Sequence, residues 1–133
     1  MIKRRNISKS HRDTFVITDI QASTIADKII GIVPVKCELV TVKEVHGTAG
    51  DDSSAVTLSI ERLQGTETST NGDAVVNATI NLKGTADTVQ TGTIVTTSSI
   101  NEFAAGDRVG INVSGTTTSL ATMIVACEFR PID

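Results

Sequence analysis

Apolar and polar residues alternate with a period of two along most of the chain after Asp13. The clearest case is the C-terminal segment, where Met123, Val125, Cys127 and Phe129 would share one face of an extended strand. Comparable alternating sets are Val56, Leu58 and Ile60; Val76, Ala78, Ile80 and Leu82; and Val109, Ile111 and Val113. Turn residues separate these sets at regular spacing, which indicates about eight short strands. The sequence therefore predicts an all-β fold, an antiparallel β-sandwich with a jelly-roll-like arrangement.

Departures from strict alternation carry more detailed predictions. Residues 29–33 are apolar apart from a glycine and predict a strand covered on both faces. The apolar face changes between Leu39 and Val40, which predicts a β-bulge. Residues 64–73 predict a long polar loop, and residues 89–97 predict a weaker strand rich in Thr. Residues 21–28 are expected in strand or loop, with a single helical turn as the alternative.

The first thirteen residues differ from the rest of the chain in charge. They contain five basic side chains and one acidic side chain, whereas the remaining residues contain seven basic and fourteen acidic ones, so a segment of +4 precedes a body of −7. We therefore divide the chain into a basic N-terminal arm, residues 1–13, and a β-sandwich domain, residues 14–133. The arm is expected to be extended and to dock on an acidic protein surface. Its docking residues are Lys3, Arg4, Arg5, Lys9 and Arg12.

Composition limits the possible partners. The chain has no Trp or Tyr and only three Phe residues, so it lacks the aromatic platforms of single-strand nucleic-acid binders and of lectins. Nucleic acid is therefore not an expected partner, although the arm alone could contact phosphates. No apolar run approaches the roughly 20 residues that span a bilayer, and no apolar segment of signal-peptide type follows the charged start. We expect no membrane association.

No combination of residues predicts an active site. His46, Asp51 and Asp52 fall in one turn-rich segment and would have to converge to bind a cation or transfer a proton, but the spacing of an EF-hand is absent. All three are expected on the surface. Asp107 follows Ala-Ala-Gly in a turn, where it is expected to bond nearby backbone N–H groups. With no nucleophile elbow and no phosphate loop, the chain is predicted not to be an enzyme and to bind neither metal nor cofactor.

Cys37 and Cys127 both lie in apolar, alternating segments. We expect two buried free thiols, because unpaired cysteine is among the most buried residue types. A disulfide is the alternative if their strands are neighbours. Two cysteines alone do not form a zinc-binding pattern.

Three blocks of sequence resemble a group of small structural proteins encoded by tailed bacteriophages. They are HGTAGDDSSAVTLSIERL at residues 46–63, LKGTADTVQTGT at residues 82–93, and FAAGDRVGINV at residues 103–113. The resemblance covers roughly residues 30–129, whereas the basic arm departs from it. It implies a virion component with an all-β sandwich, and no functional residue can be carried over from it.

Within virions, the resemblance implies a head decoration (cement) protein that is synthesised in the host cytoplasm and located on the capsid surface. Such a protein would bind the major capsid protein and bridge neighbouring capsomers through its arm. We expect a homo-oligomer, with a trimer as the first choice. The alternative is a tail or fibre module that recognises a host surface through the loop at residues 64–73.

Overall fold

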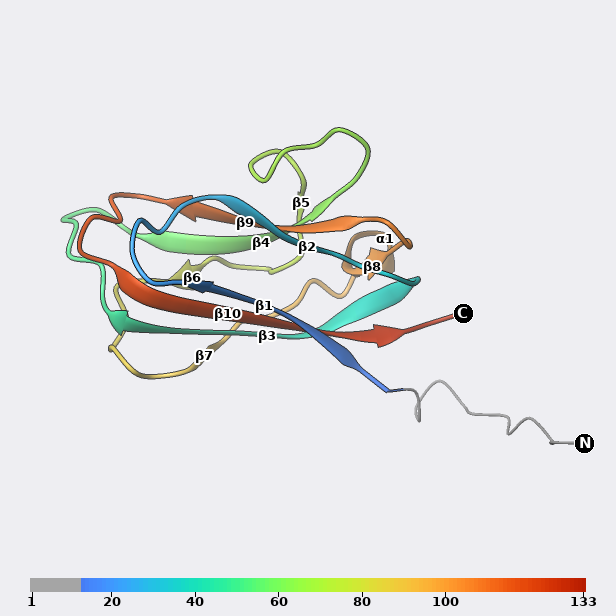
Figure 1. Cartoon of the computed structure of the whole chain (residues 1–133), viewed down its shortest axis with the longest axis horizontal. Coiled ribbons are helices and arrows are strands. Elements are labelled where there is room, and N and C mark those ends of the chain that lie inside the picture. Colours follow the sequence, from blue (N-terminus) through green and yellow to red (C-terminus); the bar gives the residue numbers. More distant parts are fainter. Residues whose placement is uncertain (1–12) are drawn as a thin grey trace, which may run out of the picture.

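The computed structural model describes residues 13–133, which form two antiparallel sheets packed face to face (Figure 1). Sheet A contains, in spatial order, β1 (Phe15–Gln21), β10 (Ala121–Pro131), β3 (Cys37–Thr48) and β7 (Gln90–Thr91), and β8 (Glu102–Phe103) also pairs with β3. Sheet B contains β2 (Lys28–Ile32), β9 (Arg108–Ser114), β4 (Thr57–Leu63) and β5 (Asp73–Ala74), and β6 (Ile80–Asn81) also pairs with β4. The all-β antiparallel sandwich predicted from the two-residue period is confirmed.

The chain passes repeatedly from one sheet to the other. Its first four strands lie alternately in sheets A and B, and the last long pair, β9 and β10, lies centrally in sheets B and A respectively. The first two strands, β1 and β2, each lie at an edge of their sheet. Almost every strand pair joins segments that are distant in sequence, so the sandwich forms only when both chain halves come together.

The predicted β-bulge lies in β3. Leu39 pairs with Phe129 and Thr41 pairs with Glu128, so Val40 is an additional residue without its own partner. This extra residue lets Leu39 and Val42 both face the core, where their exposed fractions are 3% and 0%. The change of apolar face in the sequence thus corresponds to one inserted residue, as expected for a bulge.

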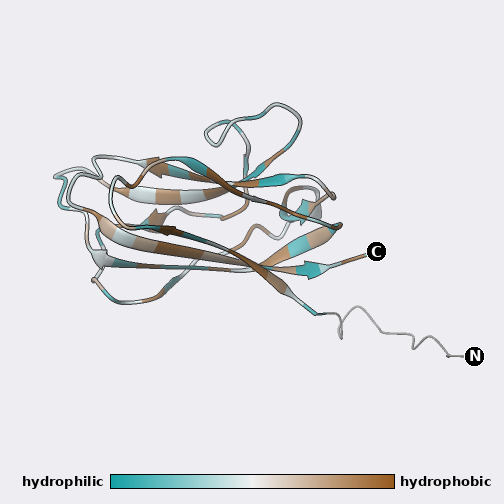
Figure 2. Cartoon of the chain, viewed as in Figure 1, coloured by the Kyte–Doolittle hydropathy of each residue, from teal (hydrophilic) through white to brown (hydrophobic). Residues whose placement is uncertain are grey.

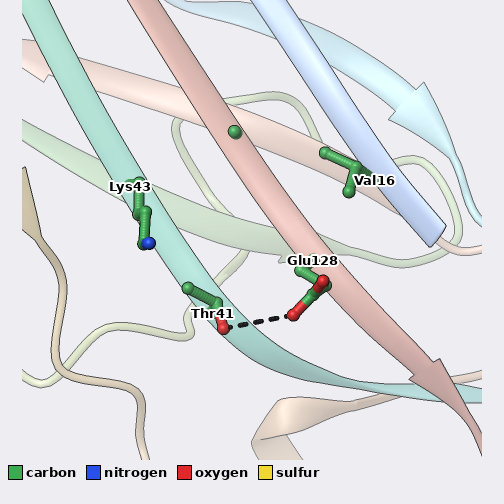
Figure 3. A pocket seen from close by; sticks show the side chains of 5 residues that line it. Val16, Thr41, Lys43 and Glu128 are labelled. Atoms are coloured by element: carbon green, nitrogen blue, oxygen red, sulfur yellow. Dashed lines mark hydrogen bonds between the residues drawn. The ribbon is translucent and has the colours of Figure 1, made fainter. Parts of the chain in front are cut away.

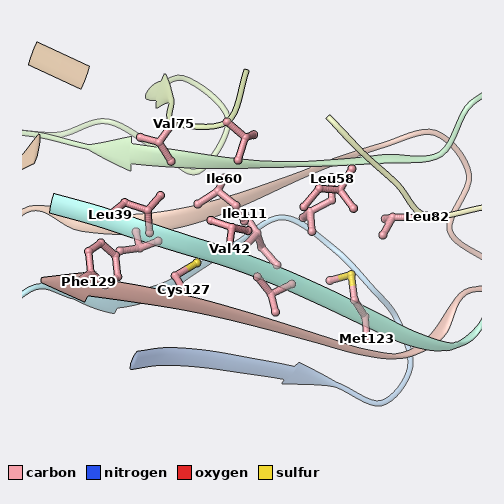
Figure 4. Packing of buried hydrophobic residues seen from close by; sticks show 14 of the residues in the cluster. Leu39, Val42, Leu58, Ile60, Val75, Leu82, Ile111, Met123, Cys127 and Phe129 are labelled. Atoms are coloured by element: carbon pink, nitrogen blue, oxygen red, sulfur yellow. The ribbon is translucent and has the colours of Figure 1, made fainter. Parts of the chain in front are cut away.

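The core lies between the sheets and is mainly aliphatic (Figure 4). The apolar set of the last strand, Met123 to Phe129, is fully buried, as predicted. All three aromatic side chains gather at one end of the core. Phe15 stacks on Phe129 with ring centroids 5.3 Å apart, and Phe103 meets Phe129 edge-on at 5.2 Å. These contacts anchor the beginning of β1.

Three predicted strands differ from the structure. Residues 29–33 are not covered on both faces, because β2 belongs to a two-sheet sandwich in which one face of each strand points outward, and Ile29 and Ile32 remain 44% and 66% exposed. The alternating residues 76–82 contribute one isolated bridge at Val76 and the short strand β6, while Ala78 is exposed. The expected strand at residues 89–97 is reduced to β7 and a bridge at Ile94.

The short helix α1 (Ser98–Asn101) was not predicted, and residues 21–28 contain no helical turn. Arg62 holds α1 in place from β4. Its Nη1 donates to the carbonyls of Ser99 and Glu102, both at 2.8 Å, and its Nη2 donates to the Asp73 carboxylate at 2.9 Å. No helix within residues 13–133 has the length and apolar character needed to cross a membrane.

The polar loop predicted at residues 64–73 is confirmed and stands above sheet B (Figure 1). Arg108 of β9 donates from its guanidinium to the carbonyls of Glu67 and Gly65, at 2.9 and 2.8 Å. From the other end, the Gly72 N–H donates to the Glu61 carboxylate at 2.8 Å. The loop is therefore fixed to the outer side of sheet B.

Candidate docking surface

The five basic residues predicted to dock, Lys3, Arg4, Arg5, Lys9 and Arg12, lie outside the described residues. What the structure does place is the root of the arm. Residue 13 leads directly into β1, the edge strand of sheet A. The stacking of Phe15 on Phe129 fixes this root against the core.

The outer face of sheet A is unexpectedly aliphatic. Ile20 of β1 pairs with Ile124 of β10, which in turn pairs with Val45 of β3, so three branched side chains form one row across the sheet. Val89, immediately before β7, extends this row by lining the same hollow as Val45 and Ile124. Ile20 and Val89 are 64% and 58% exposed. We call these four residues the aliphatic row.

Two shallow hollows mark this face. One, of about 200 Å³, is lined by Val16, Thr41, Lys43, Ala126 and Glu128 (Figure 3). The other, of about 190 Å³, lies beside the aliphatic row and shares Lys43 and Ala126 with the first. The Glu128 carboxylate accepts hydrogen bonds from the hydroxyls of Thr41 and Thr14, at 3.4 and 3.2 Å. Within residues 13–133, neither Glu128 nor Lys43 forms an ion pair.

The outer face of sheet B has a different character. Its outward positions include Ser59 and Asn112, and the loop at residues 64–73 is fixed above it through Arg108 and Glu61. Figure 2 shows hydrophilic and neutral colours in the connecting loops and brown segments along β1 and β10. An uncovered sheet face ordinarily carries polar residues. In the part of the chain that the structure describes, sheet B has large exposed aliphatic residues only on its edge strand β2, at Ile29 and Ile32, whereas those of sheet A extend across neighbouring strands.

His46 is not on the surface, which corrects the sequence-based expectation. It lies within β3 and is fully buried, because β3 extends to Thr48 and the residue continues the inward-facing set that includes Val42. Its Nδ1 lies 2.9 Å from the Glu44 carboxylate, and its Nε2 lies 2.8 Å from the carbonyl of Gly84. A carboxylate and a carbonyl are both acceptors, so this site favours the protonated ring, in which both nitrogens donate.

Burial by itself would lower the pKa of His46, but the hydrogen bonds to the Gly84 carbonyl and the Glu44 carboxylate outweigh burial and raise the pKa above its ordinary value of 6.5. Gln90 completes the group by donating to Glu44 at 3.0 Å and to the carbonyl of Asn81 at 2.7 Å. The cluster joins β3 to the irregular segment between β6 and β7. It is a structural cross-link whose hydrogen bonds join strands and loop within the described residues.

Asp51 and Asp52 occupy the predicted turn but do not converge with His46. Asp51 accepts from the Ser119 hydroxyl at 2.6 Å, and Asp52 accepts from the backbone N–H groups of Thr116 and Ser54 at 2.9 and 3.2 Å. These hydrogen bonds lower the pKa of Asp52 to about 2. The expected contact of Asp107 is confirmed, since the Ala104 N–H donates to its carboxylate at 2.9 Å.

Cys37 and Cys127 are buried free thiols, as expected. They lie on neighbouring strands, but Cys37 pairs with Pro131 whereas Cys127 pairs with Val42, so they are not opposite each other. Burial, assisted by Asp107 at Cys37, raises the pKa of each thiol to about 12. Among the described residues, no three His, Cys, Asp or Glu side chains are grouped to hold a metal ion. The outer face of sheet A is therefore the candidate docking surface.

Comparison with solved structures gives this geometry a context. All of the chain aligns with 92% of a chain from the capsid of Ralstonia phage GP4, at 14% identity and a TM-score of 0.66. A chain from the capsid asymmetric unit of cyanophage Pam1 aligns over 90% of this chain and 84% of its own length, at 11% identity and a TM-score of 0.55. The protein shares its fold with chains of two phage capsids. No protein-family model and no curated protein matches the sequence.

Two features of this site were not predicted from the sequence, although signals for both are present. Glu44 and His46 continue the alternation of Val42, which places them on the buried face. Val16, Ile20, Val45 and Ile124 are apolar at positions that alternate with buried ones. These apolar residues form one surface only when β1, β10 and β3 lie side by side in the sheet.

Proposed function

We propose that the protein is a virion structural protein of a tailed phage, specifically a capsid decoration (cement) protein. The observation that carries this proposal is the similarity of the whole chain to a phage capsid chain, with nearly complete coverage of both. The three sequence blocks that resemble small phage structural proteins point to the same class. Both capsid comparisons favour a head component over a tail or fibre module.

In this proposal, the sandwich binds the outside of the shell and the arm extends across the junction between neighbouring capsomers. Lys3, Arg4, Arg5, Lys9 and Arg12 would pair with acidic groups of the major capsid protein, while the acidic body repels nonproductive contacts of the same sign. Bridging would stiffen the shell against the pressure of packaged DNA. The arm would act on protein and not on nucleic acid.

The order of the strands supports a jelly roll as the type of sandwich. With β5 and β6 counted as one position, both sheets pair the earliest strands with the latest ones, β1 with β10 and β2 with β9. Pairing of early strands with late strands in both sheets is the arrangement of a jelly roll, which consists of two Greek keys. We further propose a homotrimer, because closed symmetric oligomers match symmetric positions of a shell.

The experiment measures binding of three purified proteins to shells that lack the protein. They are the natural chain, a deletion of residues 1–13, and a full-length control for charge in which the five basic residues are changed to Gln. We expect the deletion and the control to lower shell affinity by roughly 10- to 100-fold, because each exposed ion pair contributes about 0.2–1 kcal/mol. Raised salt should weaken the natural chain and leave the control nearly unchanged.

The outcomes separate the parts of the proposal. Unchanged occupancy after the deletion removes the arm from the mechanism. If the deletion no longer binds shells but the Gln variant still does, the arm acts through strand pairing and not through its charge. Absence of binding by the natural chain to any shell rejects the decoration function.

A further inference from the structure

We propose that the outer face of sheet A, with the aliphatic row and the adjacent Glu128 hollow, is the surface through which the sandwich contacts the shell protein. This inference rests on the decoration function proposed above. It adds a second contact to the arm and states the chemistry of its partner.

The first argument is the apolar character of the face. Ile20, Ile124, Val45 and Val89 run across the full width of sheet A, and the two outermost members are more than half exposed. Single exposed aliphatic residues are ordinary, but a row that crosses four neighbouring segments forms a patch, and patches of this kind mark interaction sites. On sheet B, the exposed aliphatic residues Ile29 and Ile32 lie on one edge strand and do not continue across the sheet, where Ser59 and Asn112 are polar.

The second argument is the position of the arm. Twelve residues precede the described part of the chain, and they join it at the start of β1, beside the hollow lined by Val16 and Glu128 (Figure 3). Fully extended, twelve residues reach about 40 Å. A partner that binds the arm is therefore held within reach of this face.

The third argument is charge. From residues 13–133, the Glu128 carboxylate receives only hydroxyl donors, and Lys43, across the same hollow, has no acidic partner there. The walls between them, Val16 and Ala126, are apolar. The matching surface is an aliphatic protein patch with a Lys or Arg opposite Glu128 and an Asp or Glu opposite Lys43.

The test uses two matched double variants of the full chain. Ile20→Glu with Val89→Glu places two charges on the aliphatic row, whereas Ile29→Glu with Ile32→Glu places two charges on the edge strand of sheet B. Exposure is similar, since Ile20 and Val89 are 64% and 58% exposed and Ile29 and Ile32 are 44% and 66% exposed. Both doubles change the net charge equally. Binding to shells that lack the protein is measured by titration, and the mass of the free protein by light scattering.

We expect the sheet A double to raise the shell dissociation constant at least about tenfold and the sheet B double to change it by less than about twofold. Equal effects of the two doubles would overturn the inference while leaving the decoration function intact. If the sheet A double splits the free oligomer into smaller species and shell binding per subunit is unchanged, a second copy covers this face and the inference is wrong. If the natural chain binds no shell, the decoration function itself fails.

Folding is checked by urea unfolding of each variant. Should the sheet A double unfold at a lower urea concentration, Ile20→Thr with Val89→Thr replaces it, with Ile29→Thr and Ile32→Thr as its control. Threonine keeps the β-branched shape and removes apolar area. We therefore expect the sheet A threonine double to weaken shell binding more than the sheet B threonine double, by a smaller factor than the glutamate variants. Equal binding by the two threonine doubles would also overturn the inference.

Discussion

The Glu44–His46 pair places two ionisable side chains on the buried side of sheet A, with exposed fractions of 1% and 0%. A buried ion pair of this kind adds little stability relative to apolar residues, but loss of one partner leaves the other uncompensated. Here every polar atom of the imidazolium has an acceptor, at Glu44 and at Gly84. The pair therefore makes folding sensitive to the protonation of one ring.

The free energy of unfolding should fall as pH rises above 6.5 and through the raised pKa of His46. Because the folded pKa of His46 is raised above 6.5, the stability it contributes is fully present below that value and is lost as pH rises through the folded pKa. The measurement is urea unfolding at a series of pH values. The Glu44→Gln, His46→Gln double variant should lack this decline. A natural chain with the same slope as the double variant would exclude the imidazolium.

At the scale of elements, the ends of β4 and β9 are fixed by close backbone contact. Gly115 follows β9 with φ +95°, and a Cβ there would lie 2.3 Å from the carbonyl oxygen of Ala55. Gly106, in the turn before β9, has a similar φ of +91° but open space around the Cβ position. The two positions separate backbone strain from steric overlap.

Gly106→Ala should lower the free energy of unfolding by about 1–2 kcal/mol, because the left-handed region strains a residue with a Cβ. Gly115→Ala should lower it by more than about 3 kcal/mol, because the backbone of residues 55–56 must also move. Urea unfolding of both variants measures the difference. Equal losses would show that the turn after β9 accommodates the added methyl group.

Elements also show where the sequence was informative. The bulge at Val40 and the burial of Met123 to Phe129 were predicted, because both depend on the order of side chains along one strand. The exposure of Ile29 and Ile32 was not, because it depends on the uncovered outer face of sheet B and on the position of β2 at its edge. An apolar run reads the same at an edge and at the centre of a sheet.

For the molecule as a whole, every buried core residue lies between Ile25 and Phe129. Removal of residues 1–13 should therefore leave the free energy of urea unfolding within about 0.5 kcal/mol of the natural value, because changes away from the core and its hydrogen bonds have effects of this size. The same deletion is expected to reduce shell binding. A large loss of stability would contradict the division into arm and sandwich.

The sequence by itself determined the β class, the bulge, the buried cysteines and the charge difference between arm and body, because each is a property of one segment and its period or composition. Only the tertiary structure decided which strands are edges, that Glu44 and His46 share a buried site with Gly84, and that Ile20, Ile124, Val45 and Val89 form one row. Those features arise from pairing between segments up to about a hundred residues apart, which local alternation does not encode.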